Sequence, residues 1–283
     1  MTQDGRHIDI GDTKLFIVEK GQGYPVIILH GGPGLDHHSF GDYLTPLEAD
    51  YRLTYVDQRS QGLSERTPSE TWTLQQIAMD VHLLAVALKF ETFAVFGHSY
   101  GSLVTQQYGV DYPGEASRLI ISAAAPSSSY LMPHVEKSLA EFEPGYLREQ
   151  VTESWANEPH AKTGEDVAQL LATQLPFHFK DPLDPRIEDL HRQTKDSVYS
   201  AEVLAYIAEK GYGGFDVEDR LHTISVPCLI LCGRFDRACA INACQTIAEK
   251  ISDSQLVIFE ESAHMFFVEE PELFLQAMRD FLE

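Results

Sequence analysis

The pentapeptide Gly97-His98-Ser99-Tyr100-Gly101 places a serine between two glycines. An apolar run, 93–96, precedes it, and a helical pattern follows it. This order is typical of a sharp strand-to-helix turn, in which a Cβ atom on either flanking residue would clash. The N-terminus of the following helix favours negative charge near the serine. We therefore predict that Ser99 is the nucleophile of an acyl-transfer reaction.

A serine hydroxyl becomes a useful nucleophile only when a base removes its proton. Around a serine turn of this kind the acid follows the serine in the chain, and the histidine follows the acid. Of the 12 histidines, His264 lies after the last strand-like run. Asp236 lies three residues after Gly233, which ends the run before it. We predict His264 as the general base and Asp236 as the acid that holds its tautomer.

The charge that develops on the substrate oxygen needs backbone N–H donors. The residue after the nucleophile, Tyr100, is expected to supply one of them. The glycine-rich segment His30–Gly34 follows another strand-like run, and we expect Gly32 to supply the second. A tight turn with positive φ would also need glycines here, and the two interpretations are compatible.

Metal and cofactor chemistry have little support in the sequence. Asp36, His37 and His38 are adjacent, but no further ligands accompany them at the spacing of a metal site. The four cysteines form no C-x-x-C pair, and Cys228 and Cys232 lie in an apolar run. Buried thiols are therefore the simplest interpretation, ahead of a metal site or a disulfide. We predict no metal, no cofactor and a reducing, cytoplasmic location.

The elements that must position these residues alternate between short apolar runs and helical patterns. This alternation predicts an α/β fold with a mostly parallel sheet and helices on both faces. A helix is expected over 74–88, with Thr73 and Gln76 forming a capping box, and a last helix is expected to begin at Pro271. The eight expected strands are 7–10, 14–20, 25–30, 51–57, 92–98, 118–125, 227–233 and 254–260.

One long segment interrupts the alternation. Between 127 and 219 the pattern indicates helices, such as 165–175 and 196–210, broken by prolines. We predict a core domain formed by 1–126 and 220–283, and a helical cap domain, 127–219, over the carboxyl ends of the strands. The alternative is a separate helical domain without a catalytic role.

The composition limits the possible partners. Hydrophobic residues make up 43% and charged residues 23%, as in an ordinary globular enzyme. Acidic residues outnumber basic ones, 43 against 21, which gives a formal charge of −22. Such a surface repels nucleic acids and anionic membranes. Apolar runs are far shorter than the ~20 residues of a membrane span, and no secretory signal is expected. The expected partner is a small molecule or a short peptide.

The sequence resembles the proline iminopeptidase family of serine peptidases, within the α/β-hydrolase superfamily. The resemblance rests on HGGPG at 30–34, VDQRSQGLS at 56–64 and GHSYGS at 97–102, and on the segments that carry Asp236 and His264. It implies an α/β-hydrolase fold and the cofactor-free release of an N-terminal residue, commonly proline, from short peptides. It also implies that the HGGPG loop supplies an oxyanion N–H, here from Gly32, and that glutamates of the cap bind the free amine.

Candidates for that amine site lie on the expected helix 196–210. Glu202 and Glu209 are seven residues apart and share a helical face with Tyr206. We expect these three residues to bind substrate, with Glu202 or Glu209 pairing with the ammonium group. The alternative is a surface pattern at helical spacing. Other cap glutamates, including Glu158, are expected to be solvated.

A second function remains open. Arg237 follows Asp236, whereas some relatives have a glutamate there that holds the amine. A positive charge at this position disfavours an ammonium group by Coulomb repulsion. A carboxylester or lactone hydrolase with the same triad is therefore the alternative. A binding protein without turnover is disfavoured, because the triad and both oxyanion elements occur together.

Overall fold

A computed structural model describes residues 5–283 and contains an eight-stranded sheet. The strand order is β1-β2-β4-β3-β5-β6-β7-β8; β1 and β2 are antiparallel to their neighbours, and all pairings from β4 to β8 are parallel. The predicted sheet is thereby confirmed. The strands are β1 (Gly5–Asp9), β2 (Lys14–Lys20), β3 (Tyr24–Leu29), β4 (Tyr51–Val56), β5 (Ala94–His98), β6 (Arg118–Ser122), β7 (Cys228–Gly233) and β8 (Ser254–Phe259).

Helices cover both faces of the sheet, as predicted. The core helices are α1 (Leu74–Leu88), α2 (Tyr100–Asp111), α8 (Ile241–Lys250), α9 (Phe266–Glu269) and α10 (Pro271–Leu282). Helices α1, α2 and α8 pack on one face, whereas α9 and α10 pack on the other. No helix of residues 5–283 is long and apolar enough to cross a membrane.

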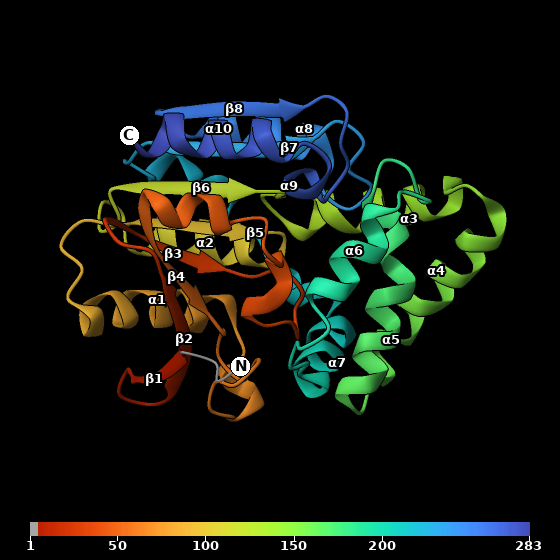
Figure 1. The fold of residues 1–283 in the computed structure, drawn as a ribbon, viewed down its shortest axis with the longest axis horizontal. Coiled ribbons are helices and arrows are strands. Elements are labelled where there is room, and N and C mark those ends of the chain that lie inside the picture. Colours follow the sequence, from red (N-terminus) through yellow and green to blue (C-terminus); the bar gives the residue numbers. More distant parts are fainter. Residues whose placement is uncertain (1–4) are drawn as a thin grey trace.

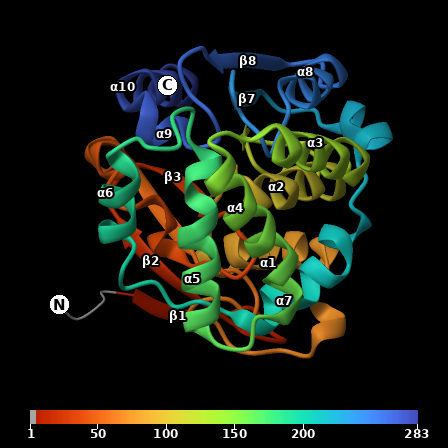
Figure 2. The same cartoon turned by 90° about the vertical axis from the view of Figure 1, so that its right-hand side faces the viewer.

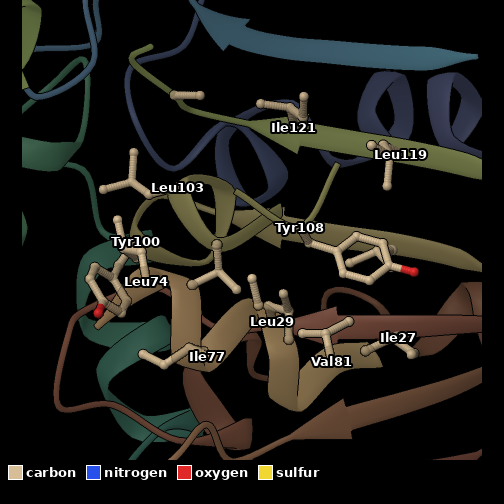
Figure 3. Packing of buried hydrophobic residues seen from close by; sticks show 14 of the residues in the cluster. Ile27, Leu29, Leu74, Ile77, Val81, Tyr100, Leu103, Tyr108, Leu119 and Ile121 are labelled. Carbon is tan, nitrogen blue, oxygen red and sulfur yellow. The ribbon is translucent and has the colours of Figure 1, made fainter. Parts of the chain in front are cut away.

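Strand residues alternate between two apolar layers because successive side chains point to opposite faces. In β3, Ile27 and Leu29 belong to the layer under α1 and α2, while Val26 and Ile28 belong to the layer under α10. Figure 3 shows Val81 of α1 beside Leu29 and Ile27 of β3, and Leu74 beside Tyr100 of α2. The central strands β3 to β7 are therefore largely buried on both faces, whereas the edge strands β1 and β8 are partly exposed.

The start of α1 differs in detail from the prediction. Thr73 caps the helix, accepting a hydrogen bond from the Gln76 backbone N–H at 3.2 Å. The Gln76 side chain does not return to Thr73 but donates to Asp80 at 3.3 Å. Asp80 is buried and binds the guanidinium of Arg59 at 2.7 Å from Nε. The expected capping box is thus only half formed, because this buried carboxylate competes for the Gln76 amide.

Five helices lie between β6 and β7. They are α3 (Ser128–Glu141), α4 (Gly145–Asn157), α5 (Gly164–Gln174), α6 (Arg186–Gln193) and α7 (Ala201–Glu209). Figure 1 shows this group, coloured green to cyan, on the side to which the β6 and β8 arrowheads point. Figure 2 shows the same group facing the viewer, with α4 and α5 in front of the sheet. The segment leaves and rejoins the core beside an isolated bridge between Ser127 and Asp216.

Helix α7 begins five residues later than predicted. The preceding residues instead bind the glycine-rich loop and the residues just after it. Ser200 N donates to Gly34 O at 2.9 Å, and Val198 N donates to Asp36 at 2.8 Å. A side chain on Gly34, whose φ is +88°, would place its Cβ 3.1 Å from the Leu204 Cβ. The glycine-rich loop and α7 are therefore packed directly together.

Candidate active site

Ser99 occupies a strained turn between β5 and α2. Its φ of 55° and ψ of −119° lie in a region that L-residues rarely adopt. A Cβ on Gly97 would lie 2.1 Å from the Gly101 carbonyl oxygen, and one on Gly101 would lie 2.4 Å from that of Leu29. Backbone atoms thus approach Gly97 and Gly101 too closely for a side chain. This is the clash that was predicted from the sequence.

The glycine-rich loop passes beside Ser99. A Cβ added to Gly31 would lie 3.4 Å from the Ser99 Cβ, and Gly32, with φ of +106°, lines the same cavity as Ser99. Tyr100 is the first residue of α2, so its N–H has no acceptor within the helix. The positions of Gly32 and Tyr100 suit two oxyanion donors, and this role remains a prediction.

Asp236 and His264 are joined by a buried hydrogen bond. His264 Nδ1 lies 2.8 Å from Asp236 Oδ2, while the Ala238 and Cys239 N–H groups each donate to Oδ1 at 2.8 Å. Burial acts to raise the pKa of Asp236, but His264 and the two N–H donors together hold it below its usual value. The carboxylate therefore stays ionised and keeps the proton of His264 on Nδ1, which leaves Nε2 to accept one.

Two further imidazoles flank His264. The ring of His98 lies 4.9 Å from that of His264, and the ring of His178 lies 4.8 Å away, measured between centroids. Burial lowers the pKa of His178 to about 3 and the pKa of His98 well below its usual value. Both neighbours are therefore neutral at physiological pH. Of these three histidines, only His264 has a carboxylate partner.

A cavity joins the core and the helices of the 127–219 segment. Its wall includes Gly32, Ser99 and His264 from the core and Glu158 and His178 from that segment. The rest is mostly apolar, and no lysine or arginine of the described chain lies on its wall. The proposed nucleophile, base and oxyanion loop thus face one space.

Glu158 is not solvated, so the expectation from the sequence was wrong. Its side chain is buried, and it lines the cavity at the end of α4. Gln174 Nε2 donates to one carboxylate oxygen at 2.9 Å, and the Tyr212 hydroxyl donates to the other at 2.7 Å. Burial raises the pKa of Glu158, and these two hydrogen bonds oppose the shift. A buried carboxylate with neutral partners alone is a candidate for binding a cation.

The residues predicted to bind substrate lie elsewhere. Glu202 is exposed and pairs with Arg66 at 3.3 Å, and Glu209 is also exposed. Tyr206 packs edge-on against Trp72 at 5.3 Å. None of the three predicted residues belongs to the cavity wall, because α7 turns the opposite side, including Leu204, toward the cavity. Their shared helical face was predicted correctly, but that face contacts the loop after β4 and the solvent.

Arg237 does not repel a ligand in the way its sequence position suggested. Its guanidinium donates to the carbonyl oxygens of Phe177, Phe179 and Lys180 and lies over the Phe142 ring at 5.0 Å. Arg237 is absent from the cavity wall. Its charge is satisfied by backbone carbonyls, so it anchors the segment that carries His178.

Two groups of side chains have the composition of metal ligands. Donor atoms of Asp36, His37 and His38 lie within 4.8 Å of one another, but the Asp36 carboxylate already binds His38 and Val198 N. A second group consists of Asp236, Cys239 and His264. All four cysteines are free and buried, as predicted.

Glu158 was expected to be solvated, and His178 was not predicted to lie near the site. Glu158 directly precedes a proline at the end of a helix, which is typical of an exposed turn, so its pattern gave no signal. His178 lies between Phe177 and Phe179, and a histidine between two aromatic residues was a sign of burial that could have been used.

With this geometry established, the chain can be assigned to a class. Residues 24–271 match the α/β-hydrolase fold family, and the protein belongs to that family. The chain is 29% identical over 273 residues to a proline iminopeptidase of Heyndrickxia coagulans, covering 93% of this chain and 92% of the relative. It is 25% identical over 260 residues to 3-oxoadipate enol-lactonase 1 of Acinetobacter baylyi, covering 92% and 89% of the two chains.

Solved structures agree on the fold. A proline iminopeptidase of Mycobacterium smegmatis superimposes with a TM-score of 0.76 at 24% identity, covering 99% of this chain and 97% of the other. An esterase of Exiguobacterium antarcticum gives the same TM-score and identity, covering 98% of both chains. The resemblance to proline iminopeptidases is confirmed, and the relatives include both peptidases and ester or lactone hydrolases.

Proposed function

We propose that this protein is a serine hydrolase that releases N-terminal residues, proline among them, from short peptides. Ser99 attacks the carbonyl carbon of the first residue while His264 Nε2 takes its proton. The N–H groups of Gly32 and Tyr100 stabilise the resulting oxyanion. His264 then protonates the leaving amine, and water releases the acyl group from Ser99 by the same route in reverse.

The observation that carries the choice of substrate is Glu158. An aminopeptidase must distinguish a free ammonium group from a blocked amine, and a carboxylate does this by a charge-assisted hydrogen bond. Glu158 is the single carboxylate on the cavity wall of the described chain, and both of its hydrogen-bond donors are neutral. A substrate ammonium would therefore be its cationic partner. We assign to Glu158 the role that the sequence suggested for Glu202 or Glu209.

A carboxylester or lactone hydrolase is the second candidate. Tyr212 and Gln174 already satisfy both oxygens of Glu158, and burial raises the pKa of its carboxyl. Glu158 can therefore remain buried without an ammonium partner, and the apolar wall around it suits a neutral acyl group. The same triad would hydrolyse either substrate.

The variant Glu158→Gln separates the two functions. We expect it to raise KM for proline 4-nitroanilide by about tenfold or more, since a charge-assisted hydrogen bond becomes a neutral one. Hydrolysis of 4-nitrophenyl acetate should change by less than about twofold, because that substrate has no ammonium group. The matched control is Glu202→Gln, which removes an exposed glutamate of the same segment and should leave both activities unchanged.

The outcomes are distinct. An equal loss on both substrates would assign Glu158 a structural role, and a melting curve of the variant would show the lost stability. Wild-type protein that hydrolyses esters or lactones but neither the proline anilide nor any other free-amine substrate would refute the peptidase function and support the second candidate.

A further inference from the structure

His178 borders the reaction centre without belonging to the predicted triad. It ends the short 3-10 turn Leu175–His178, is half-buried, and lines the cavity with Ser99 and His264. Its ring lies 4.8 Å from that of His264, and the two rings are tilted by 38° relative to each other. Whatever binds beside His264 therefore meets His178 as well.

The backbone around His178 is held from several sides. Its carbonyl oxygen accepts hydrogen bonds from His264 N at 3.0 Å and from Met265 N at 3.2 Å. Arg237 binds the carbonyl oxygens of Phe177 and Phe179, the residues on either side. These bonds cross between the 127–219 segment and the core. The His178 ring is thus fixed in relation to His264 before substrate arrives.

The polar atoms of this ring are unused. Nδ1 is buried without a hydrogen-bond partner and is closed to a ligand, whereas Nε2 is not buried and forms no hydrogen bond within residues 5–283. Because the ring lines the same cavity as Ser99 and His264, a ligand in that cavity can complete its hydrogen bonding at Nε2. The low pKa of His178, about 3, keeps the ring neutral, with one donor and one acceptor nitrogen.

We propose that His178 binds the leaving group of the substrate through a hydrogen bond from its imidazole. The leaving atom must lie at His264 Nε2, because that nitrogen protonates it. Atoms one or two bonds beyond it then fall beside the His178 ring, which packs against His264. A carbonyl group at that distance could accept a hydrogen bond from the unpaired ring. The second residue of a peptide has such a carbonyl group, and so does the leaving group of an ester formed from an amide-bearing alcohol. The inference rests on the proposed acyl transfer at Ser99, but not on the choice between peptide and ester.

Paired substrates test this binding. Prolylglycinamide and N-propylprolinamide share an acyl group and differ in whether the leaving group carries a carbonyl. Carbamoylmethyl acetate and propyl acetate form the same pair as esters. Within each pair, His178→Phe should lower the ratio of kcat/KM values, carbonyl-bearing over propyl, by about tenfold, the size expected for one hydrogen bond. His178→Gln keeps an amide donor and should retain most of that ratio.

The ratio separates leaving-group binding from a structural role. A residue that only positions His264 would slow both members of a pair equally and leave their ratio unchanged, which would overturn the proposal. An unchanged ratio with full activity would overturn it as well. If the phenylalanine variant does not fold, His178→Leu takes its place against His178→Gln. The ester pair tests leaving-group binding even if the protein cleaves no free-amine substrate. Failure of this proposal can therefore be distinguished from failure of the peptidase function.

Discussion

Replacing Asp236 by asparagine tests the assignment of the acid most directly. In the structure Oδ1 of Asp236 accepts from two backbone N–H groups, at Ala238 and Cys239. An asparagine keeps these bonds only if its carbonyl oxygen occupies the Oδ1 position. Its NH₂ group then faces His264 Nδ1, which must accept a hydrogen bond and lose its proton to Nε2. The histidine would be held in the tautomer that cannot take a proton from Ser99.

The expected loss in kcat is roughly 10⁴-fold, which at 1.36 kcal/mol per factor of ten corresponds to about 5.4 kcal/mol of transition-state stabilisation. The assay is hydrolysis of 4-nitrophenyl acetate at saturating substrate, with a melting curve to show that the fold is retained. Asp253→Asn, which removes an equal charge at an exposed site, is the matched control and should be fully active. A loss below tenfold for Asp236→Asn would falsify the tautomer argument.

Two other predictions concern Ser99 and His178. Ser99→Ala and Ser99→Gly should both abolish labelling by a fluorophosphonate probe, but only the glycine variant should gain stability, by about 1 kcal/mol in urea unfolding, because glycine tolerates a φ of 55°. Equal stability of the two variants would argue against strain at the turn. The pKa of His178 is about 3 in the folded protein and ~6.5 in the unfolded chain. The unfolded chain therefore binds a proton at His178 first, and the free energy of unfolding falls as the pH drops below about 6.5. Between pH 7 and pH 5 the wild type should lose about 2 kcal/mol more than His178→Phe, and parallel pH profiles would contradict this.

The core could be predicted from sequence because its signals are local. Eight apolar runs bounded by turns defined the strands, and the glycines around Ser99 followed from the geometry of one tight turn. Asp236 and His264 were found by chain order alone, since parallel strands deliver the loops after them to one edge of the sheet. The structure then supplied what order could not, namely the 2.8 Å contact between the two side chains.

The cap side of the cavity could not be predicted in the same way. Periodicity showed that Glu202, Tyr206 and Glu209 share a face, but not which neighbour that face meets. The orientation of α7 is set by contacts distant in sequence, with the Gly34 loop on one side and Trp72 on the other. Glu158 had no periodic signal, because its burial depends on Tyr212, 54 residues later.

These two halves carry different parts of the proposed reaction. The core supplies a nucleophile, a base and oxyanion donors that any acyl substrate would use, which agrees with a fold family whose members include peptidases, esterases and lactonases. Substrate selectivity must then come from residues of the 127–219 segment that line the cavity. Two of them, Glu158 and His178, have side chains that a ligand could still pair with. Within the described residues, the Glu158 carboxylate has no cationic partner, and the His178 ring has no hydrogen-bond partner. A substrate with an ammonium group in its acyl part and a carbonyl beyond its leaving atom would satisfy both, and a short peptide with a free N-terminus has this combination.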